Sequence, residues 1–83
     1  MENTNALTKG QVVRSIAGRD AGKVFVILEI IDDQYLYLAD GKLRKLERPK
    51  KKKVKHLQIT YDVIDLTGEV TNSYLRKSLL PYC

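Results

Sequence analysis

The apolar residues of this chain fall into short runs separated by turn-forming residues, a pattern typical of closely spaced β-strands. Residues 11–16 are β-prone, residues 17–22 are rich in turn residues, and residues 23–31 are dense in valine, isoleucine, phenylalanine and leucine. In the last of these, an extended backbone would place Val24, Val26, Leu28 and Ile30 on one face and Phe25, Ile27 and Ile31 on the other. A strand that is apolar on both faces is buried on both. We therefore expect a sheet that is covered on part of its outer surface.

A third strand is predicted at residues 35–39, where aromatic and aliphatic side chains alternate. The dipeptide that follows, Asp40-Gly41, is the one most typical of a two-residue hairpin, because both positions tolerate positive φ. A fourth strand is therefore predicted at residues 42–47. Pro49 and the lysines after it are expected to form a loop.

Alternation resumes at residues 54–60, where Leu57 and Ile59 share a face. This segment completes a set of five short strands, and residues 61–66 are a candidate for one more extended piece before Gly68. The number and spacing of the strands predict a small antiparallel β-barrel.

A short helix is predicted at residues 73–80. Thr71 and Asn72 are candidate N-caps, Leu75 and Leu79 are four residues apart, and Pro81 prevents further helix. The chain is thus expected to be mainly β, with a flexible leader at 1–8, a barrel at 9–60, and a C-terminal extension at 61–83 that contains the helix.

Positive charge is concentrated in residues 42–56, which hold nine basic residues and one acid, Glu47. The net charge of this segment is +8, although the whole chain of 83 residues carries only +5. The basic residues are Lys42, Arg44, Lys45, Arg48, Lys50, Lys51, Lys52, Lys53 and Lys55. One interpretation is a solvated loop that keeps the protein soluble; the other, which we favour, is contact with the phosphates of a nucleic acid.

The composition argues against several other classes of protein. The longest apolar run, residues 24–28, is far too short to cross a bilayer, and the first ten residues lack the order of a signal peptide. A single cysteine, Cys83, permits no internal disulfide and no cysteine-based zinc site. We expect a cytoplasmic protein that needs no metal or other cofactor and binds no membrane.

Two stretches, KGQVVR at 9–14 and GRDAGKV at 18–24, resemble the KOW motif of ribosomal proteins and transcription elongation factors. Three more, ADGKLR at 39–44, RPK at 48–50 and KHL at 55–57, resemble one KOW subgroup. Its members are small bacterial proteins similar to the fourteenth large-subunit protein of archaeal and eukaryotic ribosomes. The resemblance covers about residues 8–60.

This resemblance implies an SH3-like barrel that binds structured ribosomal RNA, with ribosomal proteins as further candidate partners. We expect the protein to be a monomer. It places RNA contacts at the turn between the first two strands, through Arg14, Gly18, Arg19, Gly22 and Lys23. The basic residues of 42–56 and His56 complete the candidate site. For the two glycines, the alternative to RNA contact is that they serve only the backbone conformation, and we favour this alternative. For Arg19, the alternative to RNA contact is an ion pair with Asp20 or another surface acid.

The aromatic residues Tyr35 and Tyr37 permit two interpretations. They could form a stacking platform for unpaired bases, or pack across the sheet against Phe25 and Ile27, which we favour. His56 is alone, without a second histidine or a nearby cysteine, so a metal site is not expected there.

Catalysis is the competing class of function, and the sequence offers little for it. Ser15, Ser73, Ser78 and Cys83 stand in no recognised nucleophile motif, and no Walker-type phosphate loop is present. We expect no enzyme. The stronger alternative is a protein-protein adaptor of the transcription or translation machinery, because SH3-like barrels bind peptides as well as RNA.

Overall fold

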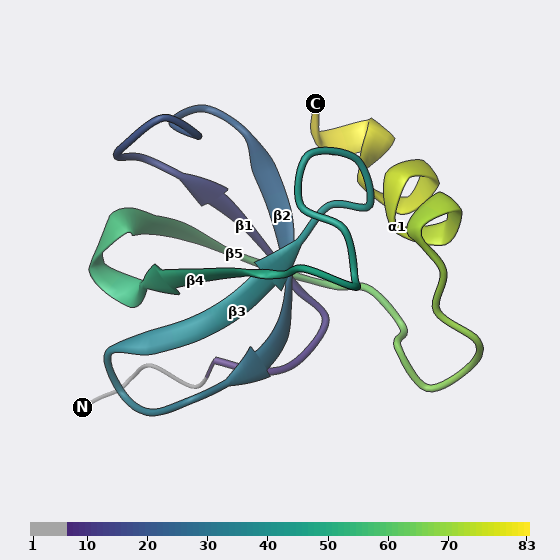
Figure 1. Ribbon diagram of the computed structural model, residues 1–83, viewed down its shortest axis with the longest axis horizontal. Helices are drawn as coiled ribbons and strands as arrows, with labels where there is room; N and C mark the ends of the chain where they lie inside the picture. Colours follow the sequence, from purple (N-terminus) through teal and green to yellow (C-terminus); the bar gives the residue numbers. More distant parts are fainter. Residues whose placement is uncertain (1–6) are drawn as a thin grey trace.

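The computed structural model describes residues 7–83 and contains one five-stranded antiparallel sheet followed by a short helix (Figure 1). The elements are β1 (Gln11–Ser15), β2 (Val24–Ile30), β3 (Tyr35–Ala39), β4 (Lys50–Lys53), β5 (Leu57–Val63) and α1 (Asn72–Leu79). Single turns of 3₁₀ helix lie at Val54–His56 and Leu80–Tyr82. The mainly β class with a C-terminal helix is confirmed. Most of the predicted leader lies outside the described residues, and the division into leader, barrel and extension stays a prediction.

The strand order is β4-β3-β2-β1-β5, so β4 and β5 are the two outer strands of the hydrogen-bonded sheet. Only three residues, Val54–His56, connect these two strands. A connection this short cannot cross a flat five-stranded sheet, because neighbouring strands are about 4.8 Å apart. The sheet must therefore curve until its edges approach each other, which is consistent with the predicted SH3-like barrel.

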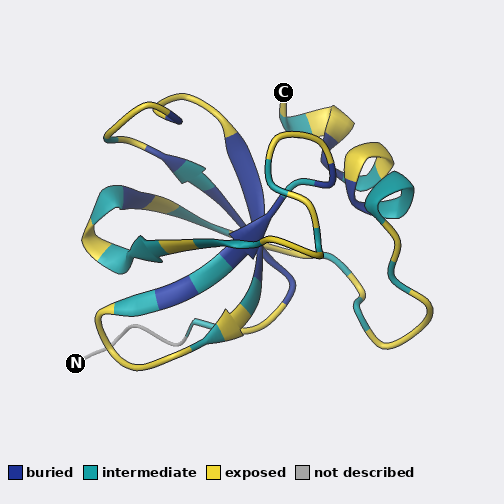
Figure 2. Cartoon of the chain, viewed as in Figure 1, coloured by how far each residue is buried: buried dark blue, intermediate teal, exposed yellow. Residues whose placement is uncertain are grey.

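Successive residues of β2 are buried, so both of its faces are covered, as predicted (Figure 2). Each face contacts a different apolar cluster. The inner cluster consists of Val13, Phe25, Ile27, Leu36, Leu38 and Leu57. The outer cluster consists of Val12, Val24, Val26, Ala39, Leu75 and Leu79. Ile30 was predicted to share a face with Val24 but packs against the inner cluster, because the pairing with β3 shifts register between Ile27 and Glu29.

The helix α1 covers the outer cluster and lies on the side of the molecule away from the β4–β5 connection (Figure 1). Leu75 and Leu79 are buried, as their spacing predicts. Thr71 is the N-cap, and its hydroxyl accepts a hydrogen bond of 3.0 Å from the backbone N–H of Tyr74. The helix spans 72–79 rather than 73–80, and Leu80 and Pro81 continue it as a 3₁₀ turn.

The predicted hairpin at Asp40-Gly41 and the fourth strand at 42–47 are wrong. Residues 40–49 form a loop that closes on itself, because the Asp40 carboxylate accepts hydrogen bonds from the backbone N–H groups of Lys42 and Arg44. Gly41 has a φ of 78°, and a side chain there would collide with the backbone of Asn72 at the start of α1. The dipeptide thus lies in a bend of the loop, but this bend packs against the start of the helix and does not connect two paired strands.

The lysine run, predicted to be a loop, is instead strand β4, which pairs with β3 along its whole length. Lysine is tolerated on an edge strand because its ammonium group reaches solvent, and charged edges also discourage pairing with other chains. β5 likewise differs in extent: it begins at Leu57 after a 3₁₀ turn and continues to Val63, so residues 61–63 belong to it. Leu57 and Ile59 both contact the inner cluster, as predicted.

Candidate nucleic-acid interface

Successive lysines of β4 lie on opposite faces of the sheet. Lys51 is opposite Tyr37 and Lys53 is opposite Tyr35, whereas Lys52 is opposite Leu36. Because directly opposed residues project to the same side, Lys51 and Lys53 share the outward face of β3 with the two tyrosines. The Nζ atoms of Lys51 and Lys53 lie 4.8 and 5.9 Å from the centre of the Tyr35 ring. Both ammonium groups are thus gathered at one aromatic ring.

The favoured interpretation of the tyrosines, packing against Phe25 and Ile27, is wrong. Those two side chains belong to the inner cluster with Leu36 and Leu38, and Tyr35 and Tyr37 alternate with these leucines along β3. Both tyrosines are half-buried beside the lysines. The outward face of β3 and β4 therefore combines aromatic rings with positive charge, which are the two features used in binding unpaired nucleotides.

The β1–β2 turn, residues 16–23, is shaped by backbone hydrogen bonds across it and within it. The N–H of Gly22 donates to the Ser15 carbonyl at 2.7 Å, and the N–H of Lys23 donates to the Asp20 carbonyl at 2.9 Å. Gly22 has a φ of 89°, and a side chain built on it would meet nothing within 4 Å. The glycine is therefore required by the backbone conformation and not by close packing, and it leaves the backbone open to solvent.

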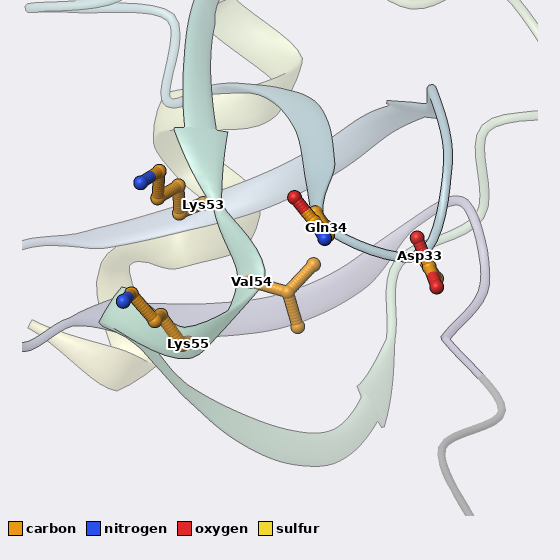
Figure 3. A pocket seen from close by; sticks show the side chains of 5 residues that line it. All are labelled: Asp33, Gln34, Lys53, Val54 and Lys55. Atoms are coloured by element: carbon orange, nitrogen blue, oxygen red, sulfur yellow. The ribbon is translucent and has the colours of Figure 1, made fainter.

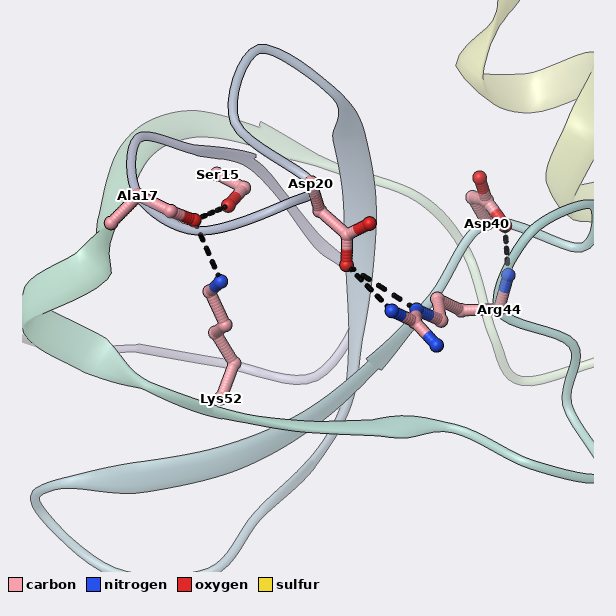
Figure 4. A network of polar contacts seen from close by, with 6 residues as sticks. All are labelled: Ser15, Ala17, Asp20, Asp40, Arg44 and Lys52. Atoms are coloured by element: carbon pink, nitrogen blue, oxygen red, sulfur yellow. Dashed lines mark hydrogen bonds and ion pairs between the residues drawn. The ribbon is translucent and has the colours of Figure 1, made fainter.

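Arg19 and Lys23 project from this turn and are exposed. The alternative that Arg19 pairs with Asp20 is not observed. Asp20 instead accepts two hydrogen bonds from Arg44, at 3.1 and 3.3 Å (Figure 4). Within residues 7–83, Arg19 forms no ion pair and no side-chain hydrogen bond. Its guanidinium group is available to an external anion.

Three of the predicted site residues hold the fold together instead. Arg14 donates to the carbonyl oxygens of Gly22 and Tyr82, at 2.8 and 3.1 Å, and so connects the β1–β2 turn to the C-terminal 3₁₀ turn. Arg44 joins the β1–β2 turn to the 40–49 loop through Asp20 (Figure 4). Lys52 Nζ donates a hydrogen bond of 2.9 Å to the Ala17 carbonyl in the same β1–β2 turn (Figure 4). Their donors are already engaged, so they are weaker candidates for phosphate contact than Arg19.

The 40–49 loop is also fixed from the side of the helix. The Asn72 amide oxygen accepts from the backbone N–H of Leu46 at 2.9 Å, and its amide nitrogen donates to the Glu47 carboxylate at 2.8 Å. This hydrogen bond holds the pKa of Glu47 below its ordinary value. Arg76 donates to the Gly41 carbonyl at 3.2 Å. The loop thus presents its exposed cations, Lys42, Lys45 and Arg48, from a defined backbone.

The remaining candidates lie along β4 and just after it. Lys50 and His56 are half-buried, and Lys55 is exposed in the 3₁₀ turn. Gly18, with a φ of 80°, lies against Lys52 Nζ. β4 is a neighbour of the β1–β2 turn through the Lys52 contact, and the 40–49 loop is joined to the same turn through Arg44. The structure thus brings the predicted turn and the basic segment 42–56 together.

Sequence reasoning missed the acids and amides that organise this surface. Asp20 and Asn72 each bind a residue of the 40–49 loop that lies more than 20 positions away from them in the sequence. No local spacing signals such partners. In residues 7–83 there is no group of three or more histidine, cysteine or acidic side chains suited to a metal ion. The described part of the chain also has no helix long and apolar enough to span a membrane.

Several known proteins resemble this chain, and a ribosomal protein is among them. The chain is 31% identical to the large ribosomal subunit protein eL14 of Staphylothermus marinus over 74 residues. The matched region is 89% of this chain and 77% of that protein. No family model matches the chain. The match therefore extends through most of the barrel and the C-terminal extension together.

Proposed function

Because this chain belongs to the family of large ribosomal subunit protein eL14, we propose that it is a ribosome-associated RNA-binding protein. Its partner in this proposal is structured ribosomal RNA, with neighbouring ribosomal proteins as further contacts. The protein acts by binding and not by catalysis, as a cytoplasmic monomer. The name eL14 is that of the relative. The RNA-binding role proposed for this chain rests on the chain's own basic surface.

The observation that carries the proposal is that Lys51 and Lys53, on the edge strand β4, both lie close to the ring of Tyr35 on β3. We call these two lysines with Tyr35 the lysine array. Two ammonium groups beside one ring repel each other, and a polyanion relieves that repulsion. Phosphate contacts of this kind supply affinity without reading sequence. Lys45, Arg48 and Lys55 extend the same positive segment on either side of β4.

The β1–β2 turn has a different role in this proposal. Arg19 is exposed and unpaired within residues 7–83, and its planar guanidinium group can form a two-pronged hydrogen bond to phosphate or stack on a base. Lys23 is exposed at the end of the same turn. We assign orientation and recognition to this turn, and electrostatic affinity to the β4 lysines.

The test is crosslinking of the protein to RNA in cells, followed by sequencing of the attached RNA. The proposal predicts strong enrichment of large-subunit ribosomal RNA, with crosslinks clustered in one or a few elements. A profile without ribosomal RNA enrichment overturns the ribosomal partner. A profile without any RNA, together with captured proteins, favours the adaptor function.

A further inference from the structure

A hollow of about 370 Å³ lies beside the lysine array, at the corner where the β2–β3 turn meets the turn after β4. Asp33, Gln34, Lys53, Val54 and Lys55 line it (Figure 3). Its base is fixed by a hydrogen bond of 2.8 Å from the Val54 N–H to the Gln34 carbonyl. A volume of this order is in the range of small-ligand sites. Lys53 also belongs to the Tyr35 array, so the hollow is continuous with the proposed RNA surface.

The lining of the hollow has two chemically different sides. Figure 3 shows the ammonium groups of Lys53 and Lys55 on one side of Val54, and the polar ends of Gln34 and Asp33 on the other. A ligand that fits this arrangement has an anionic part, a flat or apolar middle, and a polar edge that can donate hydrogen bonds. A nucleotide of RNA has these three parts in this order.

The two polar side chains at the far side are not used by the fold. The β2–β3 turn is held by Asp32, whose carboxylate accepts hydrogen bonds of 2.8 Å from the N–H groups of both Gln34 and Tyr35. Gln34 contributes only its backbone to these contacts. In the part of the chain that the structure describes, neither the Asp33 carboxylate nor the Gln34 side-chain amide has a hydrogen-bond partner.

We propose that this hollow receives one unpaired nucleotide of an RNA strand whose base carries an exocyclic amino group. The proposal rests on the RNA-binding function above and adds a specificity to it. Lys53 and Lys55 would hold the phosphate, Val54 would contact the face of the base or its ribose, and Asp33 and Gln34 would bind the edge of the base.

The selectivity follows from the donors and acceptors available. An ionised carboxylate only accepts hydrogen bonds, so Asp33 requires a donor on the base. Adenine, cytosine and guanine each present an amino group, whereas uracil presents carbonyl oxygens and a single ring N–H. The negative charge of Asp33 also repels phosphate, which fixes the orientation of the nucleotide with its phosphate toward the lysines.

The test compares the binding of fluorescein-labelled hexacytidylate and hexauridylate to the full chain by fluorescence anisotropy at one fixed salt concentration. We expect hexacytidylate to bind about tenfold more tightly, within the range for one well-placed pair of hydrogen bonds. The double variant Asp33→Ala, Gln34→Ala should bring the ratio close to one without weakening hexauridylate binding. Gln58→Ala, which removes an exposed amide from β5, is the matched control and should leave the ratio unchanged.

Nuclear magnetic resonance locates the contact independently, because the side-chain amide of Gln34 gives its own signals. Hexacytidylate should shift these signals, and hexauridylate should shift them much less. Equal affinities for the two hexamers, or a ratio that survives the double variant, overturns the proposal. If neither hexamer binds but ribosomal RNA fragments do, the hollow is not a nucleotide site and the RNA-binding function stands. If no RNA binds, both fail.

Discussion

Asp20 and Arg44, 24 residues apart in the sequence, form an ion pair with a distance of 3.1 Å between Nη2 and Oδ2. The pair joins the β1–β2 turn to the 40–49 loop (Figure 4). Asp20 is thereby unavailable to its neighbour Arg19, which faces solvent. One buried acid thus selects which arginine serves the fold and which remains available for a ligand.

Replacing Arg44 with alanine should therefore lower the stability of the domain. The Asp20 side chain is only 10% exposed, and the change leaves its carboxylate without this partner. We expect a loss of about 1–3 kcal/mol in the free energy of unfolding, measured by urea denaturation. Lys42→Ala, which removes an exposed cation from the same loop, should change it by less than about 0.5 kcal/mol. Equal effects of the two changes would show that the ion pair contributes nothing.

Gly41 tests how the 40–49 loop packs against the helix α1. Its φ of 78° is unfavourable for any residue with a side chain, and a β-carbon there would collide with the Asn72 backbone. Gly41→Ala should cost about 2 kcal/mol or more, because strain and displacement of α1 add together. Gly68→Ala is the control, since Gly68 has an ordinary φ and nothing within 4 Å of the added carbon. A neutral Gly41→Ala variant in thermal unfolding would contradict this packing.

The lysine strand should be ordered without RNA. β4 pairs with β3 at four positions, and Lys52 is tied to Ala17, so its backbone is constrained by the fold itself. In free protein, we expect ¹⁵N order parameters of about 0.8 or higher for residues 50–53, comparable with those of β2. Values below about 0.6 would show that the strand forms only when an anion is bound.

The elements that could be predicted from the sequence are those with a strong apolar pattern. β2 shows its two buried faces in consecutive apolar residues, and α1 shows its buried stripe in Leu75 and Leu79, with Thr71 as its cap. In these segments, local propensity and tertiary packing require the same residue types. Their positions were accordingly predicted to within one residue at each end.

β4 could not be predicted in this way, because an edge strand made only of lysine has no apolar alternation to detect. The register of β4 is set by its pairing with β3. The Asp40-Gly41 dipeptide, which is typical of a hairpin, is needed instead because α1 packs closely against Gly41. The candidate site was limited for a related reason. Charge alone does not distinguish Arg44 from Arg19, since the difference depends on contacts between segments far apart in sequence.

Affinity and recognition should separate between β4 and the β1–β2 turn. The double variant Lys51→Ala, Lys53→Ala removes two outward charges that no ion pair engages within residues 7–83, so it should weaken binding to cognate and unrelated RNA by similar factors. Arg19→Ala removes a planar donor and should weaken cognate RNA more. Circular dichroism should show native folds for both, because all three side chains lie outside the apolar clusters.

The opposite result would reverse these roles. If the double lysine variant lost discrimination while Arg19→Ala kept it, the β1–β2 turn would be a structural element of the barrel only. Lys52→Ala is a useful comparison, since that lysine is tied to Ala17 and its loss should affect stability more than RNA affinity.

The salt dependence of binding to a large-subunit ribosomal RNA fragment tests the central claim, that this basic surface binds RNA, most directly. If about five phosphates are contacted, the logarithm of the association constant should fall against the logarithm of salt concentration with a slope of roughly −3.5 to −4.5. The Lys51→Ala, Lys53→Ala variant should reduce the magnitude of that slope by roughly 1.4 to 1.8. A slope near zero for the unmodified protein would contradict the account and favour a protein-protein adaptor.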